Sequence, residues 1–161
     1  VSSFGGVKYV FDVGYGVGKA GLDRLTTDMA AELKPYNVHA VTLYPGAGVT
    51  EVTAFPGGET PVFTGRAVAA LLNKATNEDH ARMSGKVVQT AELAVDYGFT
   101  DVNGGMPEGD FSGVEAAKLQ REMMSKPLIQ YDMDAELPDP SETNNPGIAG
   151  LFAGAQNYSV K

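Results

Sequence analysis

A tyrosine and a lysine, Tyr15 and Lys19, stand four residues apart near the start of a segment with helical periodicity. On a helix, side chains with this spacing project from one face and can interact. A free phenol ionises at a pH of about 10, and a neighbouring ammonium group favours the phenolate, so such a pair can transfer protons near neutral pH. Spacing alone also fits an ordinary surface pair, so the surrounding elements must decide.

Hydroxyl groups and a turn sequence flank this pair. Ser2 and Ser3 lie shortly before Tyr15, at what we expect to be the end of a strand. Pro45 and Gly46 follow a second expected strand, and Thr50 comes soon after them. This order of elements favours a functional role for Tyr15 and Lys19 over an ordinary surface pair.

Two other patterns in the sequence could also indicate a functional site. The run from Gly16 to Gly21 matches G-x-G-x-x-G and follows the strand-like segment 8–13, as in a dinucleotide-binding turn. That turn requires an acid at the end of the next strand, and no carboxylate occurs between Lys34 and Thr50. His39 and His80 lack partners at ligand spacing, and cysteine is absent, so we expect no metal site.

Hydrophobic periodicity, turn residues and capping signals predict alternating helices and strands. The first helix carries an apolar stripe of Leu22, Leu25, Met29 and Leu33, and it ends at Pro35. Residues 73–82 are expected to be a polar connection. The expected elements are a helix over 13–34, a strand over 38–44, a helix over 61–72, a strand over 87–90 and a short helix over 112–124. This order predicts an α/β fold with a parallel sheet covered by helices.

The composition limits the classes of function. The 161 residues carry a formal net charge of -8, which argues against a nucleic-acid partner. No apolar run is long enough to predict a membrane span, and no secretory leader is visible, so we expect an intracellular protein. The absence of cysteine excludes disulfides and thiolate chemistry.

Taken together, these motifs resemble the short-chain dehydrogenase/reductase family. The resemblance rests first on segments 1–6, 15–20 and 44–50. It continues through segments 63–71, 84–87, 90–94, 97–99 and 101–104. It implies that residues 1–105 are the C-terminal half of a Rossmann-like domain, a doubly wound parallel sheet. Residues 106–161 match no family motif and are expected to form an irregular acidic, proline-containing extension.

The resemblance also implies roles for individual residues. Tyr15 corresponds to the catalytic acid/base of the family, and Lys19 to its partner, which binds the nicotinamide ribose. Ser3 best matches the serine that hydrogen-bonds the substrate carbonyl, because Ser3 and Gly6 keep the S-x-x-G order, with Ser2 as the alternative. Pro45, Gly46 and Thr50 fall at cofactor-binding positions. The implied cofactor is NAD or NADP, and the implied substrate is a small carbonyl compound or alcohol.

In this family the phosphate-binding glycine loop, the residue that selects NAD or NADP and a catalytic asparagine all lie upstream of the serine. Because the chain starts at Val1, we expect it to be the C-terminal part of a longer reductase. The alternative is a non-catalytic derivative, a fragment or structural subunit that packs into a larger assembly. The apolar stripe of the first helix fits either a homo-oligomer contact or packing on the chain's own sheet, and both remain open at this stage.

Overall fold

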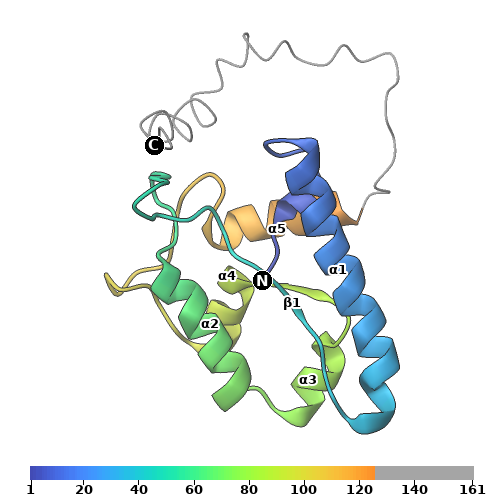
Figure 1. Ribbon diagram of the computed structural model, residues 1–161. Coiled ribbons are helices and arrows are strands. Elements are labelled where there is room, and N and C mark those ends of the chain that lie inside the picture. The colour runs from blue at the N-terminus through green and yellow to red at the C-terminus, as the bar shows by residue number, and fades with distance from the viewer. Residues whose placement is uncertain (126–161) are drawn as a thin grey trace, which may run out of the picture.

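The computed structural model describes residues 1–125, and Figure 1 shows their arrangement. The acidic stretch expected after residue 131 lies outside the described residues. In chain order the elements are η1 (Phe4–Gly6), α1 (Val13–Leu33), η2 (Lys34–Tyr36), β1 (Thr42–Tyr44), α2 (Pro61–Asn73), α3 (Asn77–Met83), β2 (Val87–Gln89), α4 (Thr90–Tyr97) and α5 (Gly113–Met124).

The sheet is parallel, as the alternating order of elements predicts. Strands β1 and β2 pair with Leu43 opposite Val88. On the other edge of β1, the backbone N–H of Ser2 donates a hydrogen bond of 2.9 Å to the carbonyl of Leu43. Successive residues of a strand direct their backbone groups to opposite edges. Ser2 therefore lies where a further strand would pair with β1, and the α/β class is confirmed.

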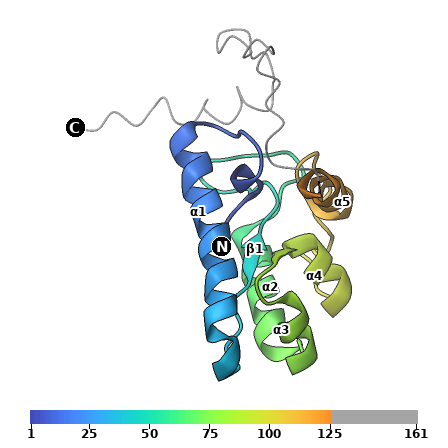
Figure 2. The same cartoon turned by 90° about the vertical axis from the view of Figure 1, so that its right-hand side faces the viewer.

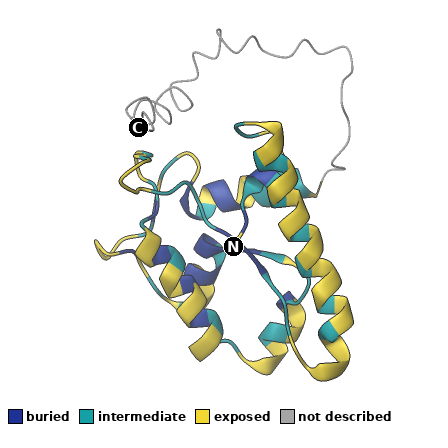
Figure 3. Ribbon diagram, viewed as in Figure 1, coloured by how far each residue is buried: buried dark blue, intermediate teal, exposed yellow. Residues whose placement is uncertain are grey.

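Helices lie on both sides of β1. Figures 1 and 2 show α1 on one side and α2, α3 and α4 on the other. Figure 3 shows that the buried residues gather around the strands and the inner faces of α2 and α4. The two strands and the three helices α2 to α4 each contribute one residue to the central cluster: Leu43, Ala67, Met83, Val88 and Leu93. This arrangement agrees with a partial Rossmann-like fold.

Helix α1 buries none of its residues, despite its length. The residues that hold it to the rest of the chain are largely polar: Asp23 accepts a hydrogen bond from Tyr44, and Thr27 Oγ1 donates one to the carbonyl of Gly85. Leu25, by contrast, is 54% exposed. Within residues 1–125, the apolar stripe of α1 is therefore not buried against the chain's own sheet. Neither α1 nor any other helix in that range is long and apolar enough to cross a membrane.

Most expected elements are found, with shifts at their ends. Helices α1, α2 and α5 end within about two residues of their expected bounds, which is the usual uncertainty of helix termini. The first strand is shorter than expected, because the ladder begins at Thr42 rather than at residue 38. Thr90 does not close the second strand but begins α4.

Two expectations about connections are wrong. Residues 77–83 form helix α3 instead of a polar loop, and a reciprocal cap between Thr76 and Asp79 stabilises its start. Segment 8–13 is not a strand, because Phe11 has a left-handed φ of 67° and Asp12 caps α1. The glycines of the G-x-G-x-x-G pattern consequently lie inside α1, and they do not form a phosphate-binding turn between a strand and a helix.

Candidate active site

Two hydroxyl groups meet where the N-terminal segment contacts the first turns of α1. Ser3 Oγ lies 2.7 Å from Tyr15 Oη, within hydrogen-bond distance, and either group can donate. Ser3 has an extended backbone, and its Oγ also accepts a hydrogen bond from the N–H of Gly5. Both side chains are half-buried. The structure therefore brings together two of the three residues that the family resemblance implies are catalytic.

Two glycines allow η1 to approach α1 closely enough for this contact. A Cβ atom added to Gly5 would lie 2.3 Å from Cε1 of Tyr15. A Cβ atom added to Gly6 would lie 2.3 Å from the Asp23 carboxylate and 3.1 Å from the Lys19 carbonyl carbon. Any larger residue at either position would push η1 away from α1. This is the physical reason for the S-x-x-G order, which the motif by itself did not reveal.

The beginning of α1 is fixed by its own neighbours. Asp12 Oδ1 accepts a 2.8 Å hydrogen bond from the N–H of Tyr15. The ring of Phe11 packs edge-on against the Tyr15 ring, with 4.9 Å between centroids. Both contacts limit how the Tyr15 side chain can move.

The two neighbouring serines have different contacts. Ser2 is buried, and its Oγ donates a 3.2 Å hydrogen bond to the backbone carbonyl of Lys19. Ser3, in contrast, reaches the phenol of Tyr15. Ser2 therefore holds the backbone of α1, while Ser3 presents its hydroxyl beside a second hydroxyl group.

Lys19 places a positive charge beside the ring of Tyr15. Its Nζ lies 5.4 Å from the centroid of that ring, within the range of a cation–π contact. The Tyr15 hydroxyl can donate a proton to an oxygen atom bound beside Ser3.

The segment Pro45–Thr50 follows the carboxyl end of β1. The N–H of Gly46 donates a 3.0 Å hydrogen bond to Oε2 of Glu59. Thr50 begins a tight turn, in which its Oγ1 accepts hydrogen bonds from the N–H groups of Val52 and Thr53 at 3.1 and 3.0 Å. Pro45 and Gly46 are half-buried and Thr50 is exposed. The position agrees with the edge of a parallel sheet where ligands bind.

Glu59 is a buried carboxylate that the sequence analysis did not single out. It is 1% exposed. Burial raises its pKa above the usual range, while hydrogen bonds from Thr90, Thr64 and the N–H of Gly46 act in the opposite direction. The sequence does contain a signal that points to Glu59. It is the last residue of the loop that begins at Pro45, directly before the helix start at Thr60 and Pro61. Its partners, however, lie on three separate elements.

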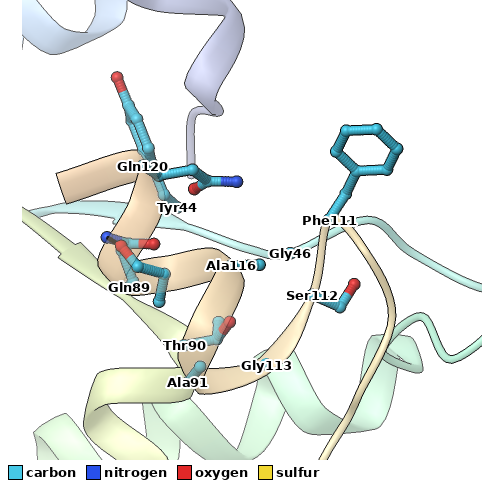
Figure 4. Close-up of a pocket in the computed structure, with 11 residues that line it drawn as sticks. Tyr44, Gly46, Gln89, Thr90, Ala91, Phe111, Ser112, Gly113, Ala116 and Gln120 are labelled. Carbon is cyan, nitrogen blue, oxygen red and sulfur yellow. Dashed lines mark hydrogen bonds between the residues drawn. The ribbon is translucent and has the colours of Figure 1, made fainter. Parts of the chain in front are cut away.

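A small pocket lies beside this segment, between the carboxyl ends of the two strands and the start of α5 (Figure 4). A Cβ atom added to Gly46 would lie 2.9 Å from Cα of Ser112. Ser112 Oγ donates a 2.8 Å hydrogen bond to the carbonyl of Ala47, and the N–H of Ala47 donates one of 2.9 Å to the carbonyl of Phe111. Phe111 and Ser112, which follow residue 105, therefore pack directly on the segment 45–50.

The sequence of the chain was compared with those of known proteins and families. No protein-family model matches the chain. The chain is 37% identical over 124 residues to dehydrogenase/reductase SDR family member 1 of Mus musculus, and equally to that of Homo sapiens. The match covers 65% of this chain, and the chain spans 39% of the length of either relative. This identity, together with the motif residues described above, supports the similarity of the chain to the C-terminal half of a short-chain dehydrogenase/reductase.

Proposed function

We propose that the protein is an NAD- or NADP-dependent oxidoreductase that interconverts a small carbonyl compound and the corresponding alcohol. Ser3, Tyr15 and Lys19 are its proposed catalytic residues. The observation that carries this proposal is the 2.7 Å contact between Ser3 Oγ and Tyr15 Oη beside the Lys19 ammonium group. The same proposal includes a doubly wound parallel sheet, in which further strands pair at the edge of β1 where Ser2 lies.

In the reduction, the carbonyl carbon gains a hydride and the carbonyl oxygen gains a proton. Ser3 Oγ binds the carbonyl oxygen, and Tyr15 Oη donates the proton to it. Tyr15 then carries the negative charge, which the Lys19 ammonium group stabilises until solvent returns a proton. In the oxidation the same groups act in reverse, so that the phenolate removes the proton of the alcohol.

The described residues fit the nicotinamide end of a dinucleotide. An ammonium group suits ribose hydroxyls, and Pro45, Gly46 and Thr50 offer backbone and hydroxyl groups at the ligand-binding edge of the sheet. When bound, the nicotinamide supplies or accepts the hydride. Residues 1–125 hold no glycine turn between a strand and a helix that could bind the diphosphate. In the family that the chain resembles, this loop lies upstream of the serine that corresponds to Ser3.

Replacing each of the two serines tests the proposal in the complete natural protein. We expect Ser3→Ala to lower kcat/KM for carbonyl reduction by about a hundredfold, because it removes a hydrogen-bond donor to the reacting oxygen. Ser2→Ala is the matched control, and we expect its kcat/KM to stay within about threefold of wild type, since its hydroxyl bonds a backbone carbonyl. The measurement is the oxidation of NADH or NADPH with a panel of aldehydes and ketones.

If Ser2→Ala abolished turnover and Ser3→Ala did not, the roles of the two serines would be reversed. A wild-type protein with no hydride transfer to any carbonyl and no dinucleotide binding would contradict the proposal and favour the non-catalytic alternative.

We further propose that the protein forms homo-oligomers, or a complex with another subunit, through α1. The supporting observation is the outer stripe, defined as Leu22, Leu25 and Met29, which are 42%, 54% and 41% exposed. These residues recur at helical spacing on the side of α1 opposite Asp23 and Thr27. An apolar stripe of this kind on a long helix is a surface suited to packing against a second helix.

Introducing a charge in the outer stripe tests this association. We expect Leu25→Asp to weaken self-association at least tenfold, because the carboxylate would lose its hydration in the contact. Sedimentation of the complete natural protein measures the change. Leu119→Asp on α5, where Leu119 is 57% exposed, is the control and is expected to leave association unchanged. Equal effects of the two variants would exclude α1 as the specific contact.

A further inference from the structure

Glu59 carries a carboxylate in the interior, in the loop between β1 and α2. At 1% exposed, it is almost completely removed from solvent. An ionised carboxylate in such a position is costly unless several donors surround it. Its hydrogen-bond partners therefore indicate what this side chain holds in place.

The side chain of Glu59 connects three elements. Its Oε2 accepts a 3.0 Å hydrogen bond from the N–H of Gly46 and a 2.7 Å hydrogen bond from Oγ1 of Thr90 at the start of α4. Its Oε1 accepts a 2.7 Å hydrogen bond from Oγ1 of Thr64 on α2. The two threonines fix the carboxylate to the helices, and the carboxylate then fixes Gly46.

The backbone of Glu59 binds the same segment. Its N–H donates a 2.9 Å hydrogen bond to the carbonyl of Ala47, and its carbonyl accepts one of 2.8 Å from the N–H of Val49. Side chain and backbone together therefore hold Gly46, Ala47 and Val49, which lie between the two ends of the Pro45–Thr50 segment.

Asp101 is a second buried carboxylate of this fold, and its hydrogen bonds differ from those of Glu59. It is 5% exposed, and it accepts hydrogen bonds from the N–H and Oγ1 of Thr60 and from the N–H of Val102. It thus secures the start of α2 without contacting Pro45–Thr50. Two buried carboxylates of similar depth therefore hold different parts of the chain.

We propose that Glu59 is a positioning residue, which holds the Pro45–Thr50 segment in the shape that receives the nicotinamide end of the dinucleotide. This inference rests on the proposed function. Glu59 does not touch the reacting atoms, and it acts through Gly46. Its loss therefore changes cofactor binding more than the proton transfer between Tyr15 and the substrate.

The test compares Glu59→Gln with Asp101→Asn in the complete natural protein. Glutamine keeps the shape of the side chain but directs an NH2 group at donors that need an acceptor. We expect KM for the dinucleotide to rise about tenfold in Glu59→Gln, with kcat within about threefold of wild type. We expect Asp101→Asn to lower the unfolding midpoint but to leave this KM within about twofold of wild type.

Hydrogen exchange supplies a readout that does not depend on turnover. In Glu59→Gln we expect faster exchange in peptides that cover residues 45–50, and unchanged exchange in α1. Thr90→Val and Thr90→Ser give a second, milder pair of variants. Valine removes the hydroxyl that donates to Oε2, so hydrogen exchange of residues 45–50 and KM for the dinucleotide should both rise, as in Glu59→Gln. Serine keeps the hydroxyl, so both quantities should stay close to those of wild type.

The outcomes separate the inference from the function on which it rests. An active wild type whose Glu59→Gln variant keeps the KM for the dinucleotide and the exchange of residues 45–50 would overturn the role of Glu59 alone. The same holds if Asp101→Asn raised this KM as much as Glu59→Gln. A wild type that neither binds NADH or NADPH nor transfers hydride would overturn the proposed function, and with it the role of Glu59 in binding cofactor.

Discussion

Tyr15→Phe is expected to lower the rate of carbonyl reduction by at least about a thousandfold, because it removes the hydroxyl that donates the proton. The substitution leaves the rest of the site in place. A phenyl ring keeps the edge-on contact with Phe11 and the Lys19 ammonium group above the ring. Dinucleotide binding is therefore expected to remain within a few fold of wild type. Turnover with NADH or NADPH and fluorescence titration of the same cofactor measure the two quantities.

Tyr9→Phe is the matched control for this variant. Tyr9 lies in the same N-terminal region but is 80% exposed. Among the described residues its hydroxyl has no hydrogen bond to Ser3 or Tyr15, so we expect wild-type turnover. Unchanged turnover in Tyr15→Phe would exclude Tyr15 as the proton donor, and loss of cofactor binding together with turnover would show that the variant disrupts the site as a whole.

The largest expected effect on stability is that of Phe63→Ala in α2. Phe63 is fully buried, and its ring centroid lies 5.2 Å from that of Phe99. Truncation leaves a cavity that the surrounding helices cannot fill, and it is expected to lower the free energy of unfolding by about 3–5 kcal/mol. This is a large part of the total stability of an ordinary domain. Urea unfolding measures the change as a lower midpoint at constant slope.

Val62→Ala on the same helix provides the comparison. Val62 is 47% exposed, so its truncation is expected to change the free energy of unfolding by at most about 0.5 kcal/mol. A loss below about 1 kcal/mol in Phe63→Ala would contradict the assignment of the Phe63 face of α2 to the core.

Helices with strong periodicity and clear end signals could be predicted from the sequence. Pro35 and Pro61 mark the end of α1 and the start of α2, and both helices lie close to their expected bounds. Helix α3 was missed because its polar residues show no apolar period, although Thr76 and Asp79 form a capping box that marks its start. Segment 8–13 reads as a strand from its residue types, but Phe11 has a left-handed backbone directly before the Asp12 cap of α1.

The candidate site could be predicted where its residues lie close together in the sequence. Tyr15 and Lys19 lie on one helix, so their spacing predicts their shared face. The resemblance favours Ser3 and leaves Ser2 as the alternative, and the structure then shows their different contacts, because neighbouring side chains of an extended segment point to opposite sides. The place of Glu59 before a helix start is visible in the sequence, but its hydrogen bonds to Gly46, Thr64 and Thr90 form only in the folded chain.

The parallel pairing of β1 and β2 also sets the order in which this fold can form. Leu43 pairs with Val88, and α2 and α3 lie between these two residues in the sequence. Ser2 is bonded to Leu43, and α1 lies between them in the sequence. Closing such long loops loses entropy before the contacts return any energy, so topologies of this kind fold slowly. Helix α1 depends on local hydrogen bonds and can form within about a microsecond. A newly made chain therefore displays Tyr15 and Lys19 on a helix early, and Ser3 joins them when the sheet closes.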